Sequence, residues 1–262
     1  QIPVDTIRAL VQSSNVYMMH IALGLMGTTY KEGMSLPNDL TVFDKLRATY
    51  EQFGLGTATG LDLPSYSTGL VNPTQSFLEK DGKTITPGTM GLALDLSFGN
   101  YDNYSTMQLA QYAATIATGG KRYAPRLIKG IYSNDSNGQL GTVLQNIPPN
   151  LLNTVELKEE QWKIIHDGFY ATTHASYGTG RKVLAGAKYD VSGKTGTAET
   201  YYYPGDGTQH EAINSSVVAY GPSDNPKIVV AVIIPHITDS NGSFNQVIAK
   251  EILDTYYDLY EK

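Results

Sequence analysis

The sequence of 262 residues contains no cysteine. Disulfide bonds and metal sites built from thiolates are therefore excluded, because both require cysteine sulfur. The absence fits an exported protein of bacteria that make little use of disulfides, and it fits a cytosolic protein equally well. Cysteine usage therefore leaves the compartment open.

Long apolar runs and blocks of like charge are also absent. The longest apolar segment, 228–234, is too short to cross a bilayer, which takes about 20 apolar residues. Any membrane anchor is therefore expected outside this chain. The 19 Lys and Arg residues against 25 Asp and Glu give a formal net charge of -6 without a basic cluster. We expect no nucleic-acid partner, since phosphate affinity comes from clustered basic side chains.

The residues that are present are typical of a folded globular protein. Apolar residues make up 41% of the sequence and charged residues 17%, without low-complexity tracts. A chain of this length can bury a sizeable core within one domain.

Apolar residues at helical spacing predict several helices. These cover 4–11, 16–26, 106–117, 157–173 and 243–260. The last one opens with Ser243-Phe244-Asn245-Gln246, which has the spacing of a capping box.

The C-terminal third changes character and predicts strands. Short β-prone runs lie at 190–200, 215–220 and 228–234, and a turn at 221–226 joins the last two as an antiparallel hairpin. A further hairpin is predicted over 127–144, with its turn at 134–138, and long surface loops over 54–103. The fold class is therefore α+β.

The most informative string is Ser192-Gly193-Lys194-Thr195-Gly196-Thr197-Ala198-Glu199, on a predicted strand. It contains K-T-G, and S-x-N occurs upstream as Ser13-Ser14-Asn15. An S-x-N is expected about once by chance in a chain of this length, whereas K-T-G is expected less often. Taken together, they are two of the three motifs, S-x-x-K, S-D-N and K-T-G, found in class A β-lactamases and penicillin-binding proteins.

The order of further motifs strengthens this match. Gln108–Gln111, Gly119-Gly120 and Gly178-Thr179-Gly180 lie between S-x-N and K-T-G. Throughout its length the chain resembles the penicillin-binding proteins, in particular a class B monofunctional transpeptidase of a Gram-positive bacterium. The resemblance implies a β-lactamase/transpeptidase-like fold, with an antiparallel sheet flanked by helices. It also implies a peptidoglycan D,D-transpeptidase that cross-links stem peptides by serine acyl transfer, without a cofactor, at the extracellular face of the cell membrane.

The same residues suggest how such a substrate is bound. Lys194, Thr195 and Thr197 offer an ammonium group and two hydroxyls, the donor set that a buried carboxylate requires, and Gly196 lies between the two threonines. Strict strand alternation turns Lys194 to the face opposite both threonines, and a bulge at the flanking glycines would remove that conflict.

Catalytic roles follow from the resemblance alone. It implies that the Thr197 N–H is an oxyanion donor, that Ser13 relays a proton to the leaving amine, and that Asn15 holds the substrate amide and a catalytic lysine. The chain departs from the family pattern because no S-x-x-K occurs in it. Threonine variants at 28–31, 118–121 and 179–182 follow S-x-N, which is the wrong order.

Only twelve residues precede Ser13, so we expect a C-terminal portion of the transpeptidase domain that lacks the nucleophile helix and the first strands of the sheet. That portion is expected to be inactive alone. Expected partners are peptidoglycan stem peptides, β-lactam antibiotics and other cell-wall synthesis, division or elongation proteins. Two alternatives stay open: a β-lactam sensor domain of a membrane receptor and a serine β-lactamase.

Other residues that could carry chemistry rank lower. The five histidines show no metal-ligand spacing, so no metal site is predicted. Asp95, Asp102, Asp190 and Glu199 are unpaired in sequence and are predicted to be solvated surface residues.

Overall fold

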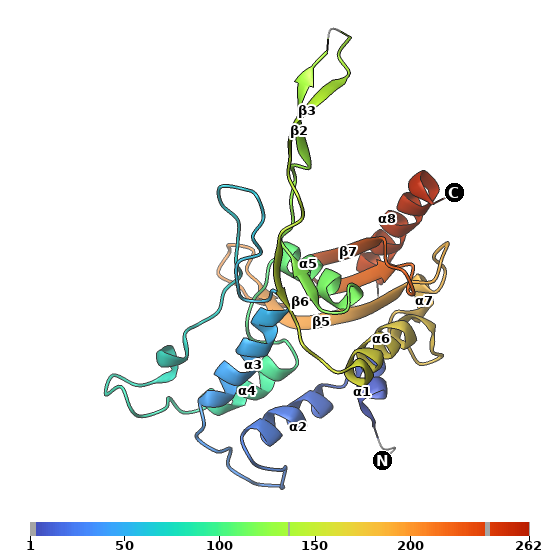
Figure 1. Ribbon diagram of the computed structural model, residues 1–262. Helices are drawn as coiled ribbons and strands as arrows, with labels where there is room; N and C mark the ends of the chain where they lie inside the picture. Colours follow the sequence, from blue (N-terminus) through green and yellow to red (C-terminus); the bar gives the residue numbers. More distant parts are fainter. Residues whose placement is uncertain (1–3, 136, 239–241, 262) are drawn as a thin grey trace.

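The computed structural model describes residues 4–135, 137–238 and 242–261, and a three-stranded antiparallel sheet lies at its centre (Figure 1). The strands are β5 (Ser192–Tyr202), β6 (His210–Gly221) and β7 (Ile228–Ile237), in the order β5-β6-β7. Within the described residues, β5 pairs with β6 alone and so forms an edge of the sheet. This edge strand carries the K-T-G motif.

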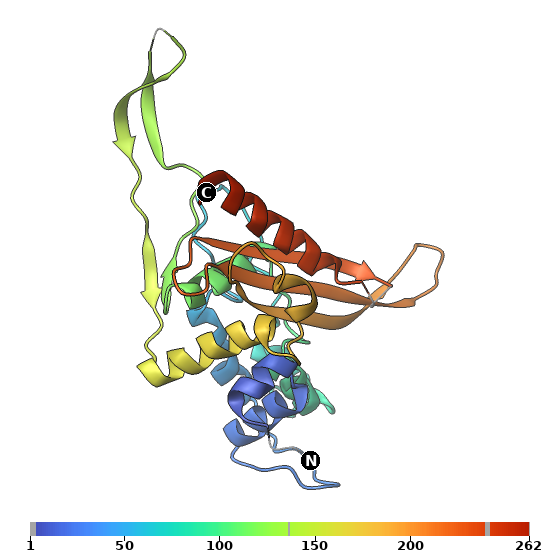
Figure 2. The same ribbon diagram turned by 90° about the vertical axis from the view of Figure 1, so that its right-hand side faces the viewer.

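Helices cover both faces of this sheet (Figure 2). One face packs against α7 (Arg181–Leu184) and α8 (Phe244–Tyr260), whose Leu253 is buried beside Val217 of β6. The other face packs against α5 (Thr106–Ala117) and α6 (Glu159–His174), with Phe169 buried beside Val218. Because neighbouring strand residues point to opposite faces, Val217 and Val218 enter two separate cores.

A second layer of helices lies beside the sheet and carries the S-x-N motif. It comprises α1 (Thr6–Gln12), α2 (Asn15–Leu25), α3 (Thr41–Gln52) and α4 (Thr89–Ser97), with the 3-10 turn η1 (Thr74–Phe77). Helix α1 packs on α6, where a Cβ at Gly168 would collide with the Leu10 side chain. The absent side chain at 168 therefore lets α1 approach α6 closely.

The segment 54–103 was predicted as surface loops, and this prediction is wrong for part of it. Residues 89–97 form α4, which buries Met90, Ala93 and Leu96 in a core shared with Phe43 of α3. Gly88, with φ of 86°, starts the helix, and Gly91 lies inside it, so the local sequence resembles a loop. Packing of three apolar side chains outweighs that local preference.

Asp102 was predicted to be a solvated surface residue, and the structure corrects this. Its carboxylate accepts hydrogen bonds from Arg47 Nε at 2.8 Å and Arg47 Nη2 at 2.7 Å, and the residue is only 7% exposed. Arg47 Nη1 also donates to the Asn72 carbonyl at 2.9 Å. This buried pair connects α3 to the loops before and after α4.

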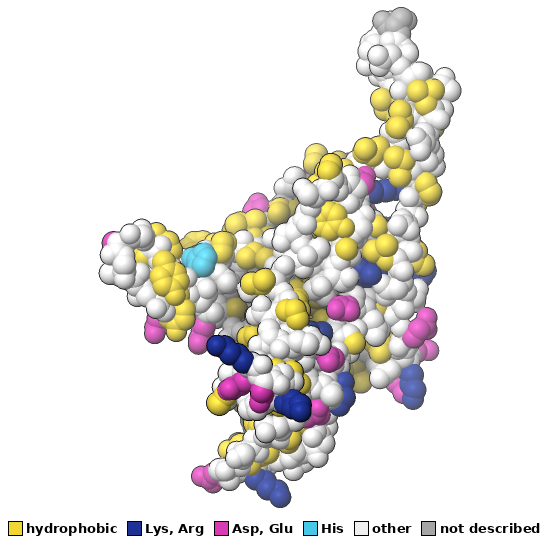
Figure 3. All heavy atoms as spheres, turned by 90° about the vertical axis from the view of Figure 1, so that its left-hand side faces the viewer, with side chains coloured by type: hydrophobic (Ala, Val, Ile, Leu, Met, Phe, Trp, Pro, Cys, Tyr) yellow, Lys and Arg dark blue, Asp and Glu magenta, His cyan; other side chains and the backbone are white. Residues whose placement is uncertain are grey.

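The other predicted elements are confirmed with shifts of a few residues at their ends, and the α+β class is confirmed. The predicted hairpin is β2 (Gly130–Asn134) with β3 (Leu140–Asn146), although Ser136 of its turn lies outside the described residues. It projects from the body and exposes apolar side chains, including Leu140 and Leu144 (Figure 3). The pairing of β1 (Lys121–Tyr123) with β4 (Leu151–Thr154) was not predicted.

No helix within the described ranges has the length and apolar composition needed to cross a membrane.

Candidate functional site

The S-x-N motif forms the tight turn between α1 and α2. Ser13 adopts the left-handed conformation, with φ of 55° and ψ of 50°, and the Ser14 N–H donates to the Ala9 carbonyl at 2.9 Å. This Schellman turn ends α1. Ser14 then caps α2, because its Oγ accepts a hydrogen bond from the Tyr17 N–H at 3.3 Å. The capping role in this turn therefore belongs to Ser14, and the Ser13 hydroxyl is free to act elsewhere.

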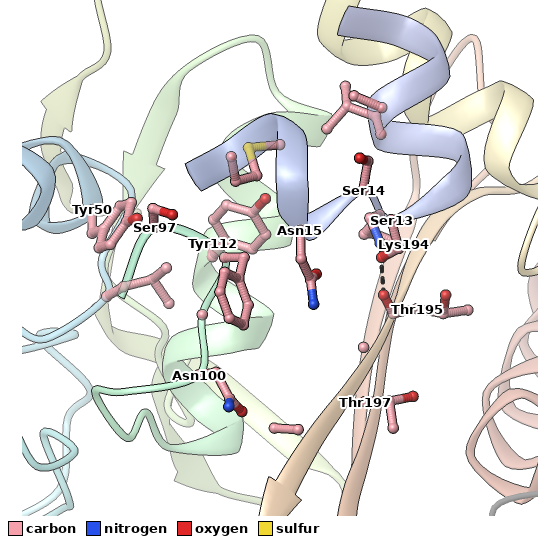
Figure 4. A pocket seen from close by; sticks show the side chains of 18 of the residues that line it. Ser13, Ser14, Asn15, Tyr50, Ser97, Asn100, Tyr112, Lys194, Thr195 and Thr197 are labelled. Atoms are coloured by element: carbon pink, nitrogen blue, oxygen red, sulfur yellow. Dashed lines mark hydrogen bonds between the residues drawn. The ribbon is translucent and has the colours of Figure 1, made fainter. Parts of the chain in front are cut away.

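Ser13 meets the K-T-G motif at the edge of the sheet (Figure 4). Lys194 Nζ donates a hydrogen bond to Ser13 Oγ and another to the Thr195 carbonyl at 2.8 Å. Burial lowers the pKa of Lys194 from its ordinary value of 10.5 to about 8, because the ammonium group loses hydration. The contact therefore joins a serine hydroxyl to an ammonium group whose pKa is lowered by burial.

No bulge forms at the glycines of β5. Pairing between β5 and β6 runs without a shift from Ser192 to Tyr202, and Lys194 lies opposite Val218 while Thr195 lies opposite Val217. Val218 and Val217 belong to the two different cores, so Lys194 and Thr195 point to opposite faces of the sheet. All three residues nevertheless border one pocket, so their shared role at a carboxylate stays a prediction.

Close packing against β6 explains why glycine occurs at both 193 and 196. A Cβ at Gly193 would lie 2.8 Å from the Val218 carbonyl oxygen, and one at Gly196 would collide with the Ser216 hydroxyl. The neighbouring strand β6 therefore leaves little room for side chains at these two positions of β5.

A pocket of about 340 Å³ opens between the α1–α2 turn and β5. Ser13, Ser14 and Asn15 line it from the helices, and residues 194–198 line it from the strand (Figure 4). All of the site residues named from the sequence, Ser13, Asn15, Lys194, Thr195, Gly196 and Thr197, border this one pocket. Lys194 is the one charged side chain among the described residues that line it, which favours an anionic ligand.

Sequence reasoning missed the aromatic side of the pocket. The pocket is also lined by Tyr50 of α3, Tyr104, Tyr112 of α5 and residues 97–100 at the end of α4. Burial raises the pKa values of Tyr50 and Tyr112 to about 12, so both stay neutral at physiological pH. Tyrosines carry no motif, and Tyr50 lies on α3, which was not predicted.

Thr179 is a further residue whose role was not predicted. It belongs to Gly178-Thr179-Gly180, between α6 and α7, and its Oγ1 accepts a hydrogen bond from Thr195 Oγ1 at 2.7 Å. The sequence signal for Thr179 is the G-T-G string, which precedes K-T-G in the chain.

Comparison with known proteins gives the same assignment throughout the chain. A family model described as the penicillin binding protein transpeptidase domain matches residues 2–254. Penicillin-binding protein 2B of Streptococcus pneumoniae is 44% identical over 258 residues, which cover 97% of this chain and 35% of that protein. The chain thus spans about a third of the length of this relative.

A solved structure and a more distant relative agree with this match. The structure of penicillin-binding protein 2B from Streptococcus pneumoniae strain R6 superposes with a TM-score of 0.85 at 42% identity, covering 98% of this chain and 39% of that one. The peptidoglycan D,D-transpeptidase MrdA of Haemophilus influenzae is 29% identical, over 96% of this chain and 36% of that protein.

Proposed function

Because the chain belongs to the penicillin-binding protein transpeptidase family, we propose that it forms the substrate-binding and proton-transfer side of a peptidoglycan D,D-transpeptidase. The observation that carries this proposal is the hydrogen bond from Lys194 to Ser13 at the edge of a pocket that Asn15 and Thr197 also line. The two motifs that bring these residues lie far apart in the sequence. Their meeting at one pocket supports a chemical role for both.

The nucleophile comes from outside residues 1–262 in this proposal. The chain contains no S-x-x-K, and a serine hydroxyl without an adjacent base is a weak nucleophile. We propose that an S-x-x-K segment completes the pocket, and we use the term complete domain for this chain joined to that segment. The match to 35% of a longer relative is consistent with such an arrangement.

The first half of the reaction is acyl transfer to that serine. Its hydroxyl proton passes to the lysine of the S-x-x-K segment as its oxygen attacks the carbonyl carbon of the penultimate D-alanine. The peptide C–N bond then breaks, and the departing amine takes up a proton. Ser13 Oγ can deliver this proton and recover one from the Lys194 ammonium group, because the two are already hydrogen-bonded. The Thr197 N–H is proposed as one donor to the oxyanion that forms on the carbonyl oxygen.

The second half transfers the acyl group to a peptide amine. The amine of another stem peptide attacks the carbonyl carbon of the acyl ester and gives up a proton. The ester bond to the serine breaks, the serine oxygen takes up a proton, and a peptide cross-link forms. Asn15 lies at the first turn of α2 and lines the pocket, where its amide can hydrogen-bond to the substrate backbone. A β-lactam would follow the first half and remain attached to the serine.

Carboxylate recognition is assigned to the hydroxyl side of β5. Thr195 and Thr197 point to the same face of the strand and line the pocket together. Lys194 acts from the opposite face, through its charge and through Ser13. We therefore propose a division of labour in which the threonines and Gly196 bind substrate and Lys194 supports proton transfer.

The proposed location is the extracellular face of the cell membrane, where stem peptides are cross-linked. An anchor would lie outside residues 1–262. Proposed protein partners are other cell-wall synthesis proteins of division or elongation.

Labelling by a fluorescent penicillin tests the proposed function. The complete domain should form a stoichiometric adduct that survives denaturation and should turn over a stem peptide ending in D-Ala-D-Ala. Labelling without any peptide turnover would favour a sensor domain. Rapid hydrolysis of a chromogenic cephalosporin would favour a β-lactamase.

A further inference from the structure

The segment between α6 and α7 places one hydroxyl directly beside the K-T-G strand. Thr195 Oγ1 and Thr179 Oγ1 lie 2.7 Å apart and share a hydrogen bond, although the two residues come from different elements. Both line a pocket of about 360 Å³ that Ser13, Asn15 and Thr197 also border. Thr179 therefore lies at the candidate site, next to a residue of the K-T-G motif.

The two glycines around Thr179 hold this segment against the end of α6. A Cβ at Gly178 would collide with the Thr172 carbonyl oxygen, so a larger residue does not fit there without a shift. The Gly180 N–H donates to that same carbonyl at 3.0 Å, and Thr172 is fully buried, with 0% exposure. Close packing therefore fixes the backbone on both sides of Thr179.

The end of α6 is connected in turn to the start of β5. Thr173 Oγ1 donates a hydrogen bond to the Val191 carbonyl at 2.6 Å, and Val191 directly precedes the strand. Both of these residues are buried. Because the segment 178–180 and β5 are both held by the end of α6, the backbone brings the hydroxyls of Thr179 and Thr195 together.

The number of protons in this hydroxyl pair limits what Thr195 can do. A hydroxyl has one proton to donate, whereas a carboxylate only accepts hydrogen bonds. When Thr195 donates to Thr179, its proton is not available to a substrate carboxylate. A hydroxyl hydrogen rotates about the C–O bond, so the hydrogen bond can reverse its direction without movement of a heavy atom. In the reversed pair Thr179 donates to Thr195, and the Thr195 proton is free for a ligand.

We propose that Thr179 is a positioning residue, which donates its hydroxyl proton to Thr195 Oγ1 and thereby directs the Thr195 O–H towards the substrate carboxylate. This inference rests on the proposed function, in which Thr195 binds that carboxylate. A hydroxyl that accepts one hydrogen bond becomes a better donor of the next, because hydrogen bonds in a chain polarise one another. Thr179 thus acts on substrate binding through Thr195.

The test compares acylation of the complete domain by benzylpenicillin and by its methyl ester, which keeps the ring and loses the charge. Thr179→Val keeps the shape of the side chain and removes the hydroxyl. The second-order acylation rate constant for benzylpenicillin should fall about fivefold, the effect of one hydrogen bond, while the constant for the ester should change less than about twofold. Thr179→Ser keeps the hydroxyl and should restore most of the wild-type constant.

A double variant tests whether Thr179 acts through Thr195. Thr195→Val should itself slow acylation by benzylpenicillin. Adding Thr179→Val to it should change the constant less than about twofold further, because the hydroxyl to be positioned is gone.

A matched control and a stability measurement separate positioning from folding. Thr255→Val makes the same change at an exposed threonine of α8 and should leave both constants unchanged. Thr179 is exposed, so its substitution creates no buried cavity, and the melting temperature of Thr179→Val should stay close to that of the wild type.

The possible failures can be told apart. If Thr179→Val slows acylation by the ester as much as by benzylpenicillin, or leaves the benzylpenicillin constant unchanged or higher, the positioning role is overturned and the proposed function stands. Independent effects of the two valine substitutions would also overturn it. If the wild-type complete domain takes up no penicillin at all, the proposed function is overturned and this inference falls with it.

Discussion

Lys194 Nζ donates a hydrogen bond to Ser13 Oγ, although 181 positions separate the two residues in the chain. Helix α1, which ends at Ser13, packs on α6, and α6 packs on the strand that carries Lys194. The contact is therefore set by two layers of packing rather than by local sequence. In the proposed mechanism, Lys194 is the cationic partner that returns a proton to Ser13 Oγ.

The pH dependence of acylation follows from the lowered pKa of Lys194. In the proposed mechanism the protonated ammonium group is the active form, and its pKa is about 8. Acylation of the complete domain by benzylpenicillin should therefore be fast below this pH and should decline as the pH rises through about 8. Lys194→Arg keeps the positive charge at high pH, so any remaining activity should lose this decline. A wild-type rate that rises through the same range would contradict the proton-donor role.

Removal of the Lys194 side chain should affect the reaction more than folding. Lys194→Ala should lower the acylation rate constant of the complete domain by about 100-fold or more, because a desolvated charged hydrogen bond is lost. The melting temperature should change little, since the same substitution relieves burial of an ammonium group. Stopped-flow acylation and thermal unfolding measure the two effects. Unchanged acylation kinetics would exclude Lys194 from the chemistry.

Substitutions of the two serines in the α1–α2 turn should distinguish helix capping from proton transfer. Ser14→Ala removes the cap of α2 and should lower the free energy of unfolding by about 1 kcal/mol. Ser13→Gly should keep or raise stability, because glycine adopts the left-handed conformation without the cost that Ser13 bears. Ser13→Gly should nevertheless slow acylation strongly. If instead Ser13→Gly reacts like the wild type, Ser13 has only a structural role.

The buried pair of Arg47 and Asp102 should be important for stability. Asp102→Ala leaves the Arg47 guanidinium buried without its carboxylate and should lower the free energy of unfolding by about 3–5 kcal/mol. Replacing both residues, as Arg47→Met with Asp102→Leu, should recover much of this loss. Denaturant unfolding of the three variants measures the difference. If the double variant is as unstable as Asp102→Ala, the unpaired charge of Arg47 is not the cause of the lost stability.

Local sequence predicted those elements whose apolar pattern and end signals agree. Residues 106–117 combine helical spacing with Gly119-Gly120 directly after the helix, and α5 has these same bounds. In contrast, α4 is preceded by Gly88 and contains Gly91, and its three buried apolar side chains became visible only through their packing on α3. Tertiary contacts, rather than local sequence preference, therefore determine that residues 89–97 are helical.

The candidate site was predictable to a similar extent. The motifs indicated that Ser13, Asn15 and the residues around Lys194 would share a pocket, and the structure places them at one. Strand periodicity correctly predicted that Lys194 and Thr195 point to opposite faces, and no bulge interrupts the pairing of β5 with β6. The capping-box spacing at 243–246 did not predict the start of α8 correctly, because Ser243 makes no side-chain cap bond within the described residues.

The proposed completion of the pocket by an external serine is tested most directly by locating the penicillin adduct. The 262-residue chain and the complete domain are each incubated with a fluorescent penicillin, denatured, digested and mapped by mass spectrometry. The account predicts no adduct on the 262-residue chain alone, and stoichiometric labelling of the complete domain at the S-x-x-K serine. A stoichiometric adduct on any residue between 1 and 262 would contradict it, because the chain would then contain a nucleophile of its own.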